Sequence, residues 1–331
     1  MGERKLKKAL RSLRRHILTP GVSETKMETR GFHVKSPESR ELLETIGETF
    51  LQGYAHAMEA RSVTEAEGRL EEVPRRFRGF AYEGAGMGCA VLDGLPFGSG
   101  SKVDDLLAGR GRNHVYMIYI GIGWAMARLP RFRWPKSTGL DPLLLWLVHD
   151  GFGFHQAYFH TRRYIDEQYQ DPGFPWPASG PRSYAGRAID QGIGRAMWFI
   201  GGADADRVTS MIDKFPERRN PDLWSGVGLA ATYAGGASAE ELQRLCDRAG
   251  TYRSHLAQGS AFAAEARVRA GLLTPQNEVA TQVLCGTTPE HAAWISLDTR
   301  PDGTVQGELP AYEVWRRRLA DQFASLGGVT P

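Results

Sequence analysis

Two acidic residues stand where they could give or take a proton. Glu83 and Asp150 each come directly before a glycine, inside a run of apolar and aromatic residues. A carboxyl group in such surroundings loses hydration, which raises its pKa and suits it to proton donation near neutral pH. We therefore predict Glu83 and Asp150 as acid–base residues. The alternative is structural, with either carboxylate paired to Arg195 or to another arginine of a neighbouring helix.

Other reactive side chains fit a catalytic or cofactor site less well. His149, Asp150, His155 and His160 lie within twelve residues, but on a regular helix only His149 and His160 share a face. One metal ion cannot reach all four, so we expect packed or surface histidines and no metal site. A dinucleotide site needs one glycine-rich turn after a strand, and the glycines of this chain stand inside helix-like runs. The sequence leaves the cofactor open.

The composition indicates an ordinary soluble protein of the cytoplasm. The 331 residues are 41% hydrophobic and 24% charged, with a net charge of +3. The longest uncharged apolar stretch, Val115–Ala127, is too short to span a bilayer, and no secretory signal is recognisable. The three cysteines, Cys89, Cys246 and Cys285, are widely spaced and odd in number, which favours a reducing compartment. We expect no nucleic-acid partner and no transmembrane segment.

The elements that must position these residues are marked by a repeated phrase. Gly-x-Gly, or a near match, recurs six times in the middle of apolar runs, with starts 30 to 41 residues apart. The copies begin at Gly84, Gly121, Gly151, Gly192, Gly226 and Gly259. A period in this range is typical of stacked helical units. It predicts an all-α fold of helical-hairpin repeats, forming either a tetratricopeptide-like solenoid or an α/α toroid.

Helical geometry then predicts which side chains face inward. Residues i and i+2 lie about 200° apart around a helix axis. Each glycine pair therefore leaves two opposite sides of its helix without side chains, where neighbouring helices can pack. The residue before each pair and the residue three after its first glycine share a third, inner face. The wall derived in this way suits a long, mostly apolar ligand with one or two polar handles. We predict polar contacts from Gln191, Arg195 and Gln258, and an apolar wall of Tyr116, Trp124, Phe154 and Trp198. The alternative is a wall filled by the protein's own loops.

The chain divides into three parts. Residues 1–37 are expected to form a basic amphipathic helix at 3–18, docked on the repeats or binding a membrane surface or partner, and a loop at 19–37. Ser36-Pro37-Glu38 is the start signal predicted for the next helix. Residues 38–296 form the repeat domain, and 297–331 a loop and a C-terminal helix packed on it. Shorter helices are expected at Ala203–Phe215 and Ser238–Ala249. The Pro/Gly-rich stretch Asp171–Pro181 reads as a connector or a lid.

Six long phrases resemble those of a bacterial family of unknown function whose genes occur in enediyne biosynthetic clusters. They are FRGFAYEGAGMGCAVLDGL (77–95), HVYMIYIGIGWAMARLP (114–130), VHDGFGFHQAYFH (148–160), AIDQGIGRAMWFIGGAD (188–204), LWSGVGLAATYAGG (223–236) and HLAQGSAFAAEARVRAG (255–271). These genes lie beside the iterative polyketide synthase that builds a polyene precursor.

The resemblance implies a role in turning a linear polyene into an enediyne core. The expected ligand is then a long polyene or polyketide, bound and tailored by this protein. The alternative is a non-catalytic scaffold that docks the synthase or another protein of the cassette. The resemblance supplies no named reaction and no catalytic residues.

Overall fold

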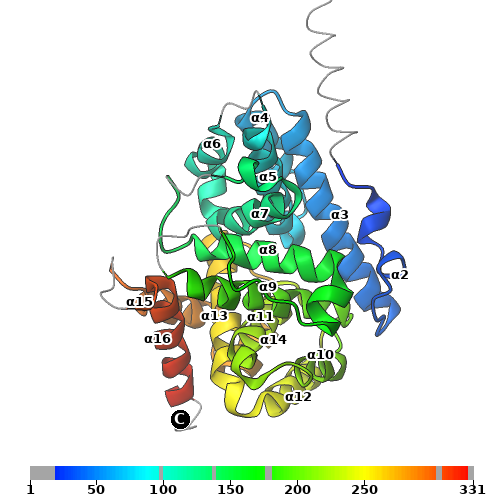
Figure 1. Ribbon diagram of the computed structural model, residues 1–331. Coiled ribbons are helices and arrows are strands. Elements are labelled where there is room, and N and C mark those ends of the chain that lie inside the picture. Colours follow the sequence, from blue (N-terminus) through cyan, green and yellow to red (C-terminus); the bar gives the residue numbers. More distant parts are fainter. Residues whose placement is uncertain (1–18, 97–99, 136–138, 176–180, 303–307, 327–331) are drawn as a thin grey trace, which may run out of the picture.

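The computed structural model describes residues 19–96, 100–135, 139–175, 181–302 and 308–326 (Figure 1). All regular structure in these ranges is helical, which confirms the all-α class. The α-helices are α2 (Met27–Arg30), α3 (Pro37–Glu59), α4 (Val63–Glu71), α5 (Arg75–Gly94), α6 (Lys102–Ala108), α7 (Val115–Arg128), α8 (Trp146–Phe159), α9 (Ala185–Ile200), α10 (Ala205–Ile212), α11 (Asn220–Tyr233), α12 (Ala239–Ala249), α13 (Arg253–Arg269), α14 (Pro275–Cys285), α15 (Pro289–Asp298) and α16 (Ala311–Leu326). Short 3-10 turns are η1 (Val22–Thr25), η2 (Arg110–His114), η3 (Arg131–Arg133), η5 (Arg182–Tyr184), η6 (Glu217–Arg219) and η7 (Gly250–Tyr252), and η4 (Arg162–Asp166) is a π-helix.

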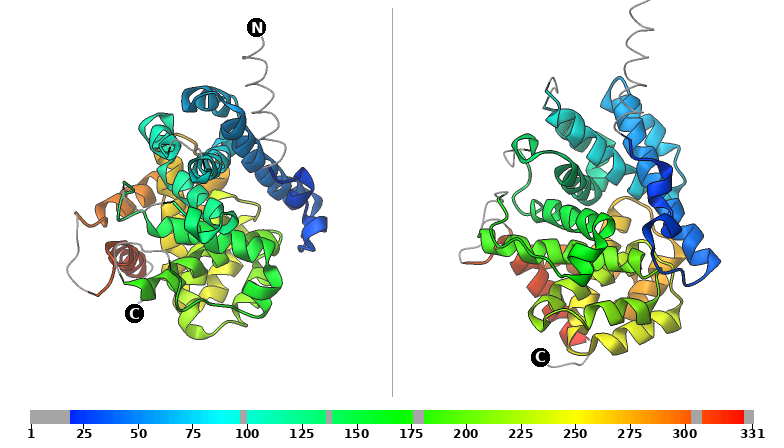
Figure 2. Two further views of the ribbon diagram at one scale, coloured as in Figure 1. Left: turned by 45° about the horizontal axis from the view of Figure 1, so that its top comes forward. Right: turned by 45° about the vertical axis from the view of Figure 1, so that its right-hand side comes forward.

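The glycine-bearing helices and α15 form one series. Helices α3, α5, α7, α8, α9, α11, α13 and α15 pack one against the next in chain order, and Figure 1 shows α5, α7, α8 and α9 following one another down the molecule. Helices α10, α12 and α14 pack in a second row against the later part of this series. Helices α3 and α16 lie at opposite sides of the molecule in every view (Figures 1 and 2).

Each Gly-x-Gly lets its helix touch two neighbours. A Cβ on Gly192 of α9 would overlap the carbonyl oxygen of Asp150 in α8, and one on Gly194 would overlap that of Leu223 in α11. Backbone contact of this kind leaves no room for a side chain, so the prediction that each pair clears two opposite sides is confirmed. Equivalent contacts are made toward the preceding helix by Gly84, Gly121, Gly151, Gly226 and Gly259, and toward the next by Gly86, Gly123, Gly153 and Gly228.

Helix α3 begins the series although it lacks the repeated phrase. A Cβ on its Gly53 would overlap the carbonyl oxygen of Ala81 in α5, just as one on Gly194 of α9 would overlap that of Leu223 in α11. In return, Gly84 of α5 faces the carbonyl oxygen of Phe50. The single Gly53 is therefore the only sequence mark of a helix that packs as the others do.

Local signals fix where the helices start and stop. Ser36 caps α3 through a reciprocal pair of hydrogen bonds with Ser39, and Pro37 takes the first helical position. Ser238 and Glu241 form the same kind of box at α12. Gly271, which follows α13, has a φ of +65°, a conformation that favours glycine. The helix starts predicted at Pro37 and near Ser238 are thus confirmed.

The loop predicted for residues 19–37 is wrong in part, because it contains η1 and α2. Tertiary contacts stabilise this short turn of helix. Met27 is buried, its N–H donates to Glu44 of α3 at 3.1 Å, and Lys26 pairs with Glu44 at 2.9 Å. Nothing in the local sequence reports these partners, which lie in the next helix. The basic helix expected at residues 3–18 lies outside the described residues.

Helix α16 is attached by a buried group of charges. Arg316 donates to Asp222 of α11 at 2.7 Å and to Glu313 at 2.8 Å, and all three side chains are at most 3% exposed. Tyr184 donates to Glu313 at 2.8 Å. The C-terminal helix therefore covers one side of α9, α11 and α13. Within the described ranges, every helix is too short or too polar to cross a membrane.

Candidate acid–base and binding site

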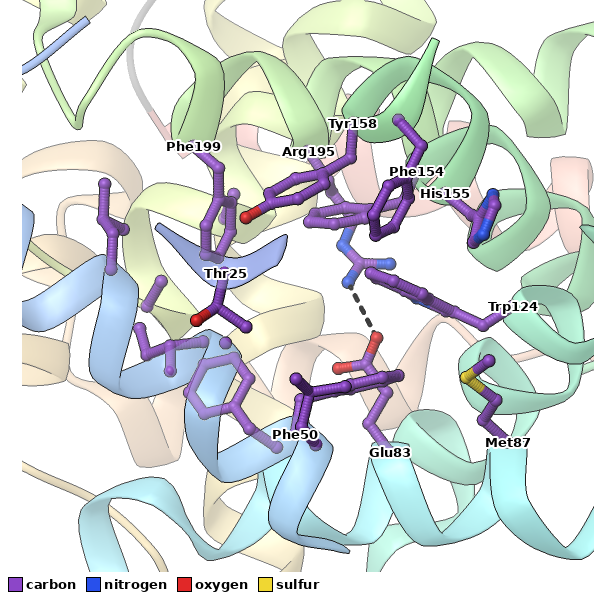
Figure 3. Close-up of a pocket in the computed structure, with 18 of the residues that line it drawn as sticks. Thr25, Phe50, Glu83, Met87, Trp124, Phe154, His155, Tyr158, Arg195 and Phe199 are labelled. Carbon is purple, nitrogen blue, oxygen red and sulfur yellow. Dashed lines mark ion pairs between the residues drawn. The ribbon is translucent and has the colours of Figure 1, made fainter. Parts of the chain in front are cut away.

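A cavity lies where helices α3, α5, α7, α8, α9 and α11 face one another (Figure 3). It holds about 860 Å³ of space not filled by atoms, its open mouth included. We call it the first cavity. Six of its lining residues occupy the positions predicted to face inward: Glu83, Met87, Trp124, Phe154, Arg195 and Leu229. The position three after the first glycine therefore lines the cavity in five of the six copies, whereas the position before the pair does so only at Glu83.

Aromatic rings make up much of the wall. Trp124 stands between Phe50 and Phe154, with ring centroids 4.4 and 5.2 Å away (Figure 3). Phe80, Tyr158 and Phe199 complete the apolar surface. The indole Nε1 of Trp124 is buried without a hydrogen bond of normal geometry among the described residues. The wall thus offers flat apolar faces.

A buried group of three charges lies at this wall. Arg195 of α9 is hydrogen-bonded through Nη1 to Asp150 of α8, and its Nη2 lies 3.7 Å from Oε1 of Glu83 in α5. All three residues are at most 5% exposed. The pairing predicted as the structural alternative is therefore present, and one arginine joins three helices. Asp150 is closer to the cation, while Glu83 faces the cavity.

The two carboxyl groups differ in their surroundings. Burial raises the pKa of Glu83 to about 7, a shift that Arg195 opposes and Asp150 reinforces. The indole N–H of Trp124 is near enough to lower it slightly. Burial also raises the pKa of Asp150, but the contact with Arg195 counters it directly. Glu83 is the group able to exchange a proton near neutral pH.

The raised pKa of Glu83 should make the free energy of unfolding depend on pH. Between an unfolded-state pKa of 4.5 and a folded-state pKa of about 7, the folded protein binds one proton more at Glu83 than the unfolded chain. Stability therefore falls as pH rises through this window, by about 1.4 kcal/mol per pH unit from this group. In Glu83→Gln the loss is absent, so urea unfolding across the window should show the variant gaining on the wild type. Parallel stability curves would contradict the assignment.

His155 was not predicted as part of the site, yet it lines the first cavity. Its side chain is buried, and burial lowers the pKa to about 3, so the imidazole is neutral at pH 7. Its Nδ1 has no hydrogen-bond partner among the described residues. The only sequence signal for His155 is its place directly after Phe154. From the sequence we expect it to be a packed or surface histidine.

The remaining predicted residues lie elsewhere. Gln191 is held by Tyr184, Asp222 and Tyr312 in the polar layer under α16. Gln258 accepts from Ser225 at 2.7 Å and is fully buried. The structure brings neither residue to the first cavity, because α16 covers the inner face of the later helices. Phe262 shows this directly, since it packs on Trp315 of α16 with centroids 4.6 Å apart.

Two predicted wall residues are also displaced. Trp198 donates its Nε1–H to the carbonyl oxygen of Gly235 at 2.9 Å and lines no part of the first cavity. Its helical angle, about 240° from Gly192, lies between the side of the second glycine and the inner face, and its hydrogen bond to Gly235 directs it away from the cavity. Tyr116 lines a separate, smaller cavity between α7, α13 and α16. Among the described residues, no three His, Cys, Asp or Glu side chains come together as metal ligands would.

Comparison with other proteins gives a family for the chain. No curated protein and no solved structure matches the sequence. A family model described as "Protein of unknown function (DUF1702)" matches residues 9–323. Since this match covers nearly the whole chain, the protein belongs to the DUF1702 family.

Proposed function

We propose that the protein binds a long, unsaturated, mostly apolar carbon chain in the first cavity and that Glu83 transfers a proton to and from it. The observation that carries this proposal is a fully buried carboxyl group facing an aromatic wall beside an already paired arginine. Because Asp150 neutralises Arg195, Glu83 is left as the additional acid of the group. A purely structural role, in which the charges only join three helices, would explain Arg195 and Asp150. It would not explain why Glu83 faces the first cavity.

The site has the parts that proton transfer to carbon requires. Glu83 would give its proton to one carbon of a conjugated chain, whose π electrons form the new C–H bond. The cation left on the chain would be stabilised by the faces of Trp124, Phe50 and Phe154. The carboxylate would be stabilised by Arg195. Return of a proton from another carbon to Glu83 would shift the double bonds and restore the enzyme.

The resemblance described above supports a polyketide polyene as that chain, on the way to an enediyne core. The recurring glycine contacts favour a stack of helical-hairpin repeats, solenoidal or closed, as the scaffold of the site. All three cysteines are free and buried, which favours action in the cytoplasm. The competing proposal is a scaffold without chemistry that docks the synthase or a partner enzyme.

The test is incubation of purified protein with the linear polyene that the synthase releases, followed by absorbance and mass spectrometry. Glu83→Gln keeps the size of the side chain but cannot donate an acid proton, so product formation should fall at least about 100-fold. Glu67→Gln is the matched control, since Glu67 is equally buried but accepts from Gly111 away from the cavity. Product at the wild-type rate from Glu83→Gln would end the catalytic proposal and favour the scaffold.

A further inference from the structure

The second cavity adjoins the first. It holds about 450 Å³ of space not filled by atoms, its opening included, between α7, α11, α13, α15 and α16. Met117, Leu229 and Tyr233 line both cavities, so these three side chains form the wall between them. A ligand in the first cavity can reach the second only past this wall. We call these three residues the neck.

The second cavity is mostly apolar, and Tyr116, Glu265 and Ser296 are among its polar lining residues. Glu265, which is 3% exposed, pairs through Oε1 with Arg269 at 2.9 Å. Its Oε2 has no hydrogen bond of normal geometry, although the hydroxyl of Tyr116 lies close enough to act on the pKa of this carboxyl. The hydroxyls of Tyr116 and of fully buried Ser296 likewise make no hydrogen bond of normal geometry within the described part of the chain.

Unused buried oxygen atoms cost free energy unless a ligand or water satisfies them. Two hydroxyl donors and one carboxylate acceptor are matched by a hydroxyl group, which accepts two hydrogen bonds and donates one. A ligand carboxylate would instead place a second negative charge beside Glu265. A hydrocarbon end would leave all three oxygen atoms unsatisfied.

We propose that the two cavities are one elongated binding site. The carbon chain of the ligand passes the neck, and its hydroxyl-bearing end contacts Tyr116, Glu265 and Ser296. This inference rests on the proposed function in taking the ligand to be a long apolar chain. It adds the chemical class of that ligand, an unbranched chain with a hydroxyl at or near one end. It also makes Leu229 and Met117 determinants of chain length.

Isothermal titration of purified protein with unbranched primary alcohols of increasing length tests the neck. Affinity should rise by up to about fourfold per added methylene until both cavities are filled. Leu229→Phe should stop this rise at shorter chains and leave short alcohols unaffected. Met117→Phe blocks the same neck from α7 and serves if the first variant folds poorly. Leu297→Phe, at an exposed leucine of α15, is the matched control and should change nothing.

The hydroxyl site is tested with Tyr116→Phe and Ser296→Ala. Each should weaken the long alcohol about fivefold, the effect of one hydrogen bond, and leave the fatty acid of equal length unchanged. Equal weakening of alcohol and acid would overturn the assignment of the hydroxyl. A length dependence that survives both neck variants would overturn the joined site.

These binding measurements separate the two proposals. Neck-dependent binding of long alcohols without any turnover of the polyene would support the joined site and contradict proton transfer by Glu83. Product formation that depends on Glu83 but not on the neck would do the reverse.

Discussion

Replacing Arg195 with methionine should lower the free energy of unfolding by about 3–5 kcal/mol at pH 7. The arginine is the only cation in contact with Asp150 among the described residues, and it also faces Glu83. Methionine keeps the packing over the ring of Phe154, which lies 5.0 Å from the guanidinium, but removes the charge. The loss therefore arises because a buried aspartate is left without its partner, and because both carboxyls must then be protonated or pull water inside.

Urea unfolding measures this loss. One further variant is a control, and another tests whether the unpaired charge is its cause. Arg162→Met is the matched control, since Arg162 pairs with Glu167 at the surface and should cost less than about 1 kcal/mol. Asp150→Asn added to Arg195→Met should recover part of the loss, because the amide needs no counter-charge. If Arg195→Met costs no more than Arg162→Met, the three charges do not hold α5, α8 and α9 together.

Gly192→Ala should destabilise the protein by more than about 4 kcal/mol or prevent folding. The new methyl group would overlap the carbonyl oxygen of Asp150, a backbone atom that cannot move aside by changing rotamer. Helices α8 and α9 would have to separate, and the site would open with them. Thermal unfolding, or recovery of soluble protein where folding fails, measures the effect.

Gly68→Ala is the matched control for this substitution. Gly68 is an exposed glycine inside α4, and a Cβ there would meet nothing within 4 Å. Alanine favours a helix over glycine, so this variant should gain about 0.5–1 kcal/mol. Equal behaviour of the two variants would show that the glycine contacts in the series are not required.

The acid–base residues illustrate how far sequence reasoning reaches. Glu83 and Arg195 could be assigned to one face because helical angles are local and regular. The same arithmetic placed Gln191 and Gln258 on that face, and there it misled, because α16 covers the later helices. His155 and Phe50 were missed since neither stands at a marked position, and Phe50 belongs to a helix that carries only Gly53 of the expected pair.

The sequence by itself determined that the chain is helical, where α3 and α12 begin, and which two sides of each glycine-bearing helix meet a neighbour. These properties depend on residues a few positions apart, through capping, periodicity and the absence of a side chain. Only the tertiary structure decided which part of the inner surface stays open. That outcome depends on α3 and α16, which come from the two ends of the described chain, and on the charges that fix them, such as Arg316 on Asp222. Local spacing does not predict contacts between distant segments, so the cavity beside Glu83 could be found only in the structure.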